Sequence, residues 1–291
     1  MNKQLLDQLI DYATTTDFSD DISEARREYK ERVGEVYEDD QSYEHRMLHF
    51  IEWYVFDRNL NGKTITPLFD FIEKNKNQWS ETIFQDFFCL TKNIHGLFKI
   101  KKISRDHVIV YNFFNGSKYK VMDEQSQLIF RKNDLFEGRI IPGTSGDSFT
   151  RAFCFHPHES EKFIKKEINK LMDQLEFHQG QLKKLNKIKN HQERSLLKTN
   201  ERLKKLIINI EKTTFNFRLK RYKAQIKDFE SHKTAIEKGI EKSNNLIKEN
   251  ETSINLDVGI SAQVRLMLRL ANMSLKWERF RQIDMKDIYT N

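Results

Sequence analysis

The feature that most constrains this sequence is a run of apolar residues spaced alternately four and three positions apart, which fills much of residues 159–250. This spacing is the heptad pattern of a coiled coil, in which one seam of a helix packs against a partner helix. A first seam ends at Ile210, and a second begins at Tyr222 in a different phase. The seam positions are Ile164, Ile168, Leu171, Leu175, His178, Leu182, Leu185, Lys189, Gln192, Leu196, Thr199, Leu203, Leu206 and Ile210, then Tyr222, Ile226, Phe229, Lys233, Ile236, Ile240, Ser243 and Ile247.

The phase of the heptads changes near residues 213–216, where two threonines and an asparagine weaken a helix. A reversal at this point would make residues 159–250 an antiparallel helical hairpin. A straight helix that dimerises fits the same pattern. We therefore expect a long coiled coil or helical hairpin, paired either within one chain or between chains.

The heptad segment is also basic. Residues 159–250 contain 23 Lys and Arg against 13 Asp and Glu, whereas residues 1–158 contain 21 against 25. Such a segment can bind nucleic acid, an acidic protein or anionic lipid, although charged flanks are also what a solvated helix needs. Cations and aromatic residues alternate around the phase change, which is a pattern that suits phosphate and base contacts. The candidate nucleic-acid-binding residues are Lys204, Lys205, Arg218, Lys220, Arg221 and Lys223.

Composition sets the class of protein. The chain of 291 residues has 10 Gly and 3 Pro, which favours long helices over turns. Its two cysteines, Cys89 and Cys154, are too few for a disulfide framework. No secretory signal and no stretch of about eighteen apolar residues is present, so we expect a cytoplasmic protein without a transmembrane segment.

The first 95 residues predict two helical parts. Residues 1–42 form a charged helical arm, with a helix that begins at Ser23. Residues 43–95 form a small helical module around Tyr43–Asp57, a helix that is apolar nearly all round and therefore buried on several sides. Two further helices are expected to start at Thr66-Pro67 and at Ser80.

Residues 96–158 change from helical to alternating periodicity and predict five short strands. Asn115-Gly116 indicates a two-residue hairpin turn with positive φ at both positions. Five strands in about 60 residues are typical of a small β-barrel. The fold class is therefore α+β: a small helical module and a five-stranded, barrel-like β-module, followed by the coiled coil or hairpin.

Residues 251–291 predict a linker and an amphipathic tail helix over residues 260–281. A basic amphipathic helix can lie on a membrane surface. Docking of its apolar side on the rest of the chain is the commoner arrangement, so membrane-surface contact is not expected.

Two sets of residues have the spacing of metal ligands. His45 and His49 lie four apart on one helical face, with Glu52 one turn further on. Cys154, His156 and His158 alternate along an extended segment and share one face, where His95 or His107 would supply a further ligand. Structural, hydrogen-bonded histidines and a small buried cysteine are the simpler explanation of both patterns. No motif for an organic cofactor or for catalysis is present, and none is expected.

Several stretches resemble a region of uncharacterised bacterial proteins: HFIEWYVFDRNLNGKTITPLFDFIEKN, GLFKIKKI, NFFNGSKYKVMDE, NDLFEGRII and AFCFHP. The similarity covers Tyr43–Pro157, with Lys276–Arg279 as a further match. Some similar proteins carry the cysteine-rich SEC-C metal motif, which this chain with two cysteines lacks. The resemblance implies a shared architecture and no catalytic residues.

These patterns lead to three functional hypotheses. The first is a non-enzymatic scaffold or adaptor that acts through protein–protein contacts and coiled-coil assembly. The second is a nucleic-acid-associated protein that uses the basic helices. The third is a metal-dependent protein or enzyme built on one of the two candidate ligand sets.

Overall fold

The computed structural model describes residues 3–122, 126–143, 146–253 and 260–290. The chain divides into two compact units, one made of residues 1–170 and 263–291 and the other of residues 171–262. The first unit is therefore discontinuous in sequence, because its last elements follow the whole of the second unit.

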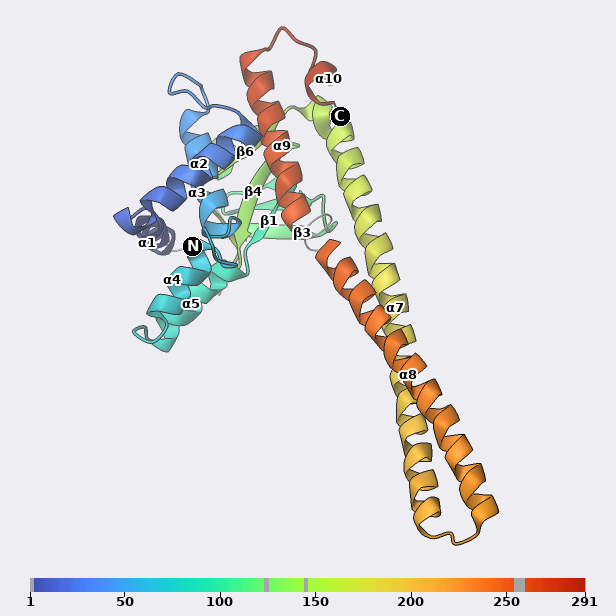
Figure 1. The fold of residues 1–291 in the computed structure, drawn as a ribbon. Coiled ribbons are helices and arrows are strands. Elements are labelled where there is room, and N and C mark those ends of the chain that lie inside the picture. Colours follow the sequence, from blue (N-terminus) through green and yellow to red (C-terminus); the bar gives the residue numbers. More distant parts are fainter. Residues whose placement is uncertain (1–2, 123–125, 144–145, 254–259, 291) are drawn as a thin grey trace. The chain divides into compact units, whose positions relative to one another are not determined.

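The first unit begins with a group of helices that surround α3 (Figure 1). The helix α3 contacts α1, α2, α4 and strand β6, and it buries Phe50, Trp53, Tyr54 and Val55. It is the central helix of this unit, as its all-round apolar sequence predicted. The helices are α1 (Lys3–Ala13), the 3-10 turn η1 (Thr16–Phe18), α2 (Ser19–Val33), α3 (Tyr43–Phe56), α4 (Pro67–Asn75) and α5 (Glu81–Thr91).

Two of the three predicted helix starts are confirmed. Ser80 precedes α5, and its hydroxyl accepts a bond from the amide of Ile83. Thr66 precedes α4 with Pro67 at the first position, although its hydroxyl makes no capping bond. The predicted start at Ser23 is wrong, because α2 already begins at Ser19. Ser23 lies inside this helix and donates to the Ser19 carbonyl at 2.7 Å.

A curled antiparallel sheet follows the helices (Figure 1). Five strands lie along one path in the order β3-β2-β1-β4-β5, and β6 pairs with β4. The two ends of the path approach each other through a bridge between Val121 and Asp147, so the sheet is a half-barrel. The strands are β1 (Ile94–Ile103), β2 (His107–Asn112), β3 (Lys118–Met122), β4 (Leu135–Ile141), β5 (Ser148–Phe149) and β6 (Cys154–His156), with the short helix α6 (Ser126–Ile129) before β4.

Two predictions for the β-module need correction. The fifth predicted strand divides into β5 and β6, and residues 150–153 belong to neither, although the Thr150 amide still donates to the Arg139 carbonyl at 3.0 Å. The turn after β2 is longer than two residues, because the Asn112 amide donates to Ser117 and the Gly116 amide donates to Asn112. Gly116 has a φ of 68°, but Asn115 is not in the positive region.

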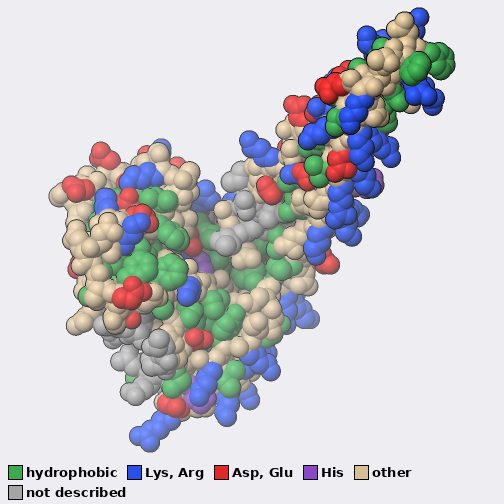
Figure 2. Space-filling model, turned by 90° about the horizontal axis from the view of Figure 1, so that it is seen from below, with side chains coloured by type: hydrophobic (Ala, Val, Ile, Leu, Met, Phe, Trp, Pro, Cys, Tyr) green, Lys and Arg blue, Asp and Glu red, His purple; other side chains and the backbone are tan. Residues whose placement is uncertain are grey.

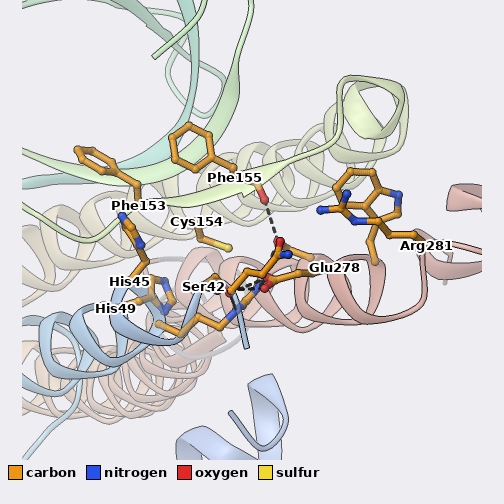
Figure 3. A pocket seen from close by; sticks show the side chains of 12 residues that line it. Ser42, His45, His49, Phe153, Cys154, Phe155, Glu278 and Arg281 are labelled. Carbon is orange, nitrogen blue, oxygen red and sulfur yellow. Dashed lines mark hydrogen bonds and ion pairs between the residues drawn. The ribbon is translucent and has the colours of Figure 1, made fainter. Parts of the chain in front are cut away.

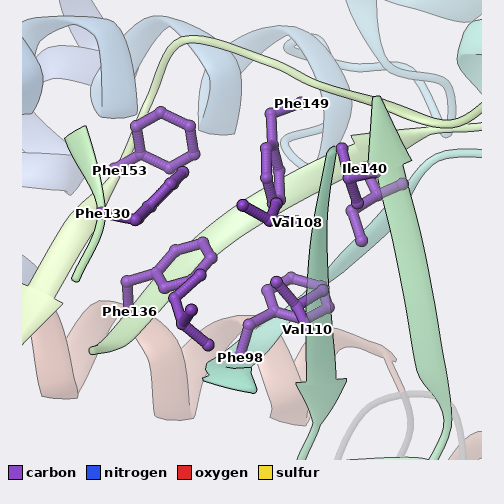
Figure 4. Close-up of a cluster of buried hydrophobic side chains, with 10 residues drawn as sticks. Phe98, Val108, Val110, Phe130, Phe136, Ile140, Phe149 and Phe153 are labelled. Carbon is purple, nitrogen blue, oxygen red and sulfur yellow. The ribbon is translucent and has the colours of Figure 1, made fainter. Parts of the chain in front are cut away.

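Phenylalanine side chains fill the concave side of the sheet (Figure 4). The ring of Phe130 lies 4.7 Å from that of Phe136 and 5.0 Å from that of Phe153, measured between centroids. Phe98, Val110 and Ile140 complete the contacts from β1, β2 and β4. This cluster occupies one face of β4 and leaves the opposite face for the helices.

The tail helix α9 (Ile260–Arg279) docks on the first unit, as its amphipathic sequence predicted. Asn272 donates to the Val33 carbonyl at 2.8 Å, and Ser274 donates to the Phe155 carbonyl at 2.7 Å. The helix therefore joins α2 to strand β6. The 3-10 turn η2 (His158–Ser160) and the short helix α10 (Met285–Ile288) also belong to this unit.

The second unit is an antiparallel pair of helices (Figure 1). The helix α7 (Glu161–Glu211) starts in the first unit and continues here, and α8 (Asn216–Ser253) returns after a reversal at the predicted phase change. Ser243 donates to Gln192 at 2.9 Å, so polar positions of the two predicted seams meet. The two helices thus form a hairpin within one chain; coiled-coil packing of the heptads along its length stays a prediction.

None of the helices in the described part of the chain is both long enough and apolar enough to span a bilayer.

Candidate metal centre

The face of β4 that points away from the phenylalanine cluster carries charged side chains. All seven residues of β4 are buried, and they include Glu137 and Arg139. In the ladder, His95 of β1 pairs with Arg139, and Cys154 of β6 pairs with Glu137. Because side chains alternate along a strand, Glu137, Arg139, His95 and Cys154 share one face, and so does His156.

The helix α3 covers this face and adds His49. The Nε2 atom of His49 lies 2.7 Å from Oε1 of Glu137, and Nε2 of His95 lies 2.9 Å from the same oxygen. The hydroxyl of Tyr29 lies 2.7 Å from Nδ1 of His49 and fixes that ring from behind. One carboxylate oxygen therefore receives two imidazoles, one from the helical layer and one from the sheet.

A second group shares the same carboxylate. Ligand atoms of Glu137, Cys154 and His156 lie within 4.8 Å of one another. The three residues are 0%, 6% and 6% exposed. Oε2 of Glu137 and Nε2 of His156 have no hydrogen-bond partner in the described part of the chain. Burying two polar atoms without partners costs free energy. These two atoms therefore have lone pairs that are free to bind a cation.

The protonation states favour ligand atoms in the second group. Burial would raise the pKa of Glu137, but the neighbouring His49 and His95 outweigh it and lower the pKa, so the carboxylate is ionised. Burial lowers the pKa of His156 to about 4, so its imidazole is neutral at pH 7 and keeps a free lone pair. Burial raises the pKa of the Cys154 thiol to about 11, so this thiol holds its proton until a cation displaces it.

His95 has a different electrostatic setting from His156. Burial and the nearby Arg139 lower the pKa of His95, but the ion pair with Asp57 and the bond to Glu137 outweigh them, and the pKa is raised. Both ring nitrogens of His95 have partners, because Nε2 contacts Glu137 and Nδ1 lies 3.1 Å from the guanidinium of Arg139. His95 is thus suited to hold the carboxylate of Glu137 in place, whereas His156 has a ring nitrogen left for a cation.

Other buried charges keep this face rigid. Arg139 donates to Asp57 at 2.5 Å, which ties β4 to the end of α3. Glu52 of α3 accepts from the Thr150 hydroxyl at 2.8 Å and from the amides of Arg151 and Ala152, both at 3.1 Å. These bonds position the segment that leads into β6.

The structure divides the first predicted ligand set, which was His45, His49 and Glu52. His45 is exposed, His49 bonds to Glu137, and Glu52 is occupied by the segment before β6. The three do not form a cluster of ligand atoms among the described residues.

The second predicted set is divided as well. Cys154 and His156 lie together, but the exposed His158 is in the turn η2, with Nε2 3.9 Å from Asp134. Of the two suggested additional ligands, His95 contacts Glu137, and His107 bonds to Asp106 instead. The sequence reasoning missed Glu137. A carboxylate within the apolar stretch DLFEGRII is the signal that could have identified it.

The candidate nucleic-acid-binding residues lie on both sides of the reversal between α7 and α8. All six are exposed, and none of them forms an ion pair within the described ranges. Exposed aromatic rings lie between them, with Phe215 at 66% and Phe217 at 80% exposure. Figure 2 shows Lys and Arg side chains gathered over the hairpin.

Comparison with protein families gives one match, which covers residues 1–195 and is described as a family of unknown function (DUF7986). The chain belongs to this family. The expected relation to an uncharacterised family is thereby confirmed. The DUF7986 match contains Glu137, Cys154 and His156, whereas α9 and α10 lie outside it. Comparisons with curated proteins and with solved structures found no significant match.

Proposed function

We propose that this protein binds one transition-metal ion of the zinc type through Glu137, Cys154 and His156. The observation that carries the proposal is the convergence of these three buried side chains with two donor atoms that have no other partner. A cation at this point would satisfy both atoms. It would also replace the proton of Cys154, since thiolates and neutral imidazoles are the forms that bind metals.

The donor set favours a particular class of metal. Zn²⁺ binds sulfur, imidazole nitrogen and carboxylate oxygen, and combinations of these three occur in zinc sites. Mg²⁺ and Ca²⁺ prefer oxygen ligands and fit a thiol poorly. The hydrogen bonds of Glu137 to His49 and His95 support the site from behind, as second-layer contacts do in metal proteins.

The test measures metal bound per chain on untagged protein loaded with Zn²⁺ or Co²⁺. The expected result is one ion per chain, with an ultraviolet thiolate–cobalt charge-transfer band in the Co²⁺ form. Cys154→Ala should remove this band, and His156→Ala should lower the affinity strongly.

The matched controls are His107→Ala and His158→Ala, which change suggested histidine ligands that lie outside the cluster. Both should keep one ion per chain. Circular dichroism of each variant establishes that it is folded. Loading below one ion per chain in the wild type, or equal loss in the controls, would overturn the proposal.

We also propose that the protein is a scaffold or adaptor and that the hairpin of α7 and α8 contacts its partner. Exposed aromatic rings and exposed cations without carboxylate partners support this role, because they leave both apolar area and charge for a partner. A second copy of the chain is not required as the partner of α7, since α8 lies against it within one chain.

Light scattering and gel shifts on the full chain test this role of the hairpin. A protein partner or oligomer that is lost when Phe215 and Phe217 become Ser supports the scaffold. A gel shift with DNA or RNA that weakens steeply with salt, and disappears when the six cations become Gln, favours the nucleic-acid alternative instead. A monomer that binds neither would contradict both.

A further inference from the structure

A cavity of about 240 Å³ is lined by Cys154, one member of the proposed ligand set (Figure 3). Cys154 of the ligand set and His49, which supports Glu137, both line it. The other walls come from the start of α3, from strand β6 and from the end of α9. A molecule in this cavity would therefore lie next to the sulfur atom that is proposed to bind the metal.

The number of protein ligands decides whether the metal site is closed or keeps a position for another molecule. Structural zinc sites have four protein ligands and are closed, whereas sites with three protein ligands keep a fourth position for water or another molecule. Glu137, Cys154 and His156 make three, and His95 is occupied with Asp57 and Glu137. The open position would face the cavity, because Cys154 is the member of the set that lines it.

The charges around the cavity are unequal. Arg46 and Glu278 neutralise each other, with Nη2 and Oε2 3.3 Å apart, and Ser42 donates to the same oxygen at 2.6 Å. Arg281 lines the cavity without a carboxylate partner among the described residues, and its guanidinium lies 5.7 Å from the Trp277 ring centroid. An anionic group could pair with Arg281.

The remaining walls determine the size and polarity of the molecule that the cavity can hold. Phe153, Phe155 and Trp277 supply apolar and aromatic surface. The volume lies below the roughly 300 Å³ at which pockets for drug-sized ligands usually begin, so the occupant is small.

We infer that the cavity binds a small carboxylic acid with a second donor group, such as a thiol, hydroxyl or carbonyl. Its carboxylate pairs with Arg281, and its donor group takes the fourth position on the metal. This inference rests on the proposed metal function and extends it: the metal centre is open to a ligand, not closed and purely structural.

The experiment uses the full chain loaded with Co²⁺ and a pair of probes, 3-mercaptopropionate and its uncharged amide. A thiol that enters the open position adds a second thiolate–cobalt band, which reports binding directly. The acid should bind more tightly than the amide by about two- to fivefold, the usual effect of an ion pair with an exposed arginine such as Arg281. Arg281→Gln should remove this difference and leave the affinity for the amide unchanged.

The matched control is Arg265→Gln, an exposed arginine of α9 that does not line the cavity. It should behave as the wild type does. If Co²⁺ binds with the Cys154 band but neither probe alters the spectrum, the open position is wrong and the metal site stands. If both probes bind equally in the wild type, the carboxylate assignment is wrong. If Co²⁺ does not bind, the proposed function itself fails.

Discussion

The imidazole of His156 depends on one distant hydroxyl for its orientation. Its Nδ1 atom lies 3.1 Å from the hydroxyl of Tyr289, and its Nε2 atom is the one without a partner. A histidine that ligates a metal through one nitrogen usually has the other nitrogen hydrogen-bonded, which fixes the ring and its tautomer. In the proposed metal site, Tyr289 would therefore be a positioning residue that acts through His156.

Tyr289→Phe should weaken Zn²⁺ binding about 10- to 100-fold without abolishing it, because the ligand remains but loses its support. Competition with a chromophoric chelator measures this change. Tyr119→Phe serves as the control, since its hydroxyl bonds to the exposed Asn115 in the loop after β2. Equal weakening in both variants would contradict a positioning role.

Asp70 illustrates a buried charge whose role is structural. Its carboxylate accepts from Tyr12 and Lys63, both at 2.6 Å, and pairs with Lys74 at 3.0 Å. Burial alone would raise the pKa of Asp70, but these cationic and hydroxyl donors lower it from 3.8 to about 2. This carboxylate ties α1 to α4.

Because the folded pKa of Asp70 is depressed, its stabilisation is complete above about pH 5 and is lost as the pH falls through about 2. Asp70→Asn should therefore lower the free energy of unfolding by about 1–2 kcal/mol at pH 7 and by little near pH 2. Urea unfolding at both pH values tests this. Asp86→Asn, an exposed change on α5, serves as the control and should leave the free energy of unfolding nearly unchanged. A loss of equal size at both pH values would be inconsistent with the assignment.

Residue-level prediction from the sequence succeeds where the spacing is local. Cys154 and His156 were placed on one face because a strand repeats every two residues. Glu137 escaped, because its partners are distant in the chain: His49 is 88 positions away and His95 is 42. Only the register of β1, β4 and β6 brings these side chains together.

At the scale of elements, strand β4 is constrained on both faces. Its charged face forms the candidate metal centre, and its other face packs into the phenylalanine cluster. Gly138 of this strand faces the phenylalanine cluster. A Cβ atom there would meet the Phe136 ring at 3.1 Å and the Phe153 ring at 3.2 Å.

Gly138→Ala should therefore destabilise the protein by about 1–3 kcal/mol, as overpacking of a core does. The comparison variant is Gly180→Ala on α7, where an added Cβ would meet nothing within 4 Å. That change should be stabilising by about 0.5–1 kcal/mol, because alanine favours a helix over glycine. Thermal unfolding of both variants measures the two effects, and a change of the same sign in both would refute the argument.

Element types followed from the sequence more readily than their ends and turns. The helix reversal near residues 213–216 was visible as a change of heptad phase, and it lies where α7 ends. The pattern could not choose between hairpin and dimer, since the same apolar seam suits either partner. The division of the last strand was invisible, because the bonds of Glu52 to Thr150 and Ala152 are tertiary contacts.

At the scale of the whole molecule, the first unit needs its C-terminal elements. Arg46 of α3 donates to the Ala271 carbonyl at 3.2 Å and pairs with Glu278, both on α9. Without α9, Arg46 would lose these partners, and the surfaces of α2 and β6 that bond to Asn272 and Ser274 would be exposed to water. The family match ends at residue 195 and so omits part of what this unit requires.

Replacing residues 171–262 by a flexible Gly/Ser linker should give a folded protein that binds one metal ion, because every residue of the first unit is retained. A chain that stops after residue 195 should not fold, because it lacks α9 and α10. Circular dichroism and metal content compare the two. A folded, metal-binding chain of 195 residues would show that α9 is dispensable.

The discontinuity of the first unit also imposes an order on synthesis. The hydrogen bond from Ser42 of the helical layer to Glu278 can form only after Glu278, 236 positions later, has been synthesised. At about 5–20 residues per second, the ribosome needs on the order of ten seconds between residue 170 and the emergence of α9. During that interval the surfaces of α2, α3 and β6 that α9 covers lie open to solvent and to chaperones. Tyr289 arrives later still, so the nascent chain completes the surroundings of His156 after nearly all of the described sequence has been translated.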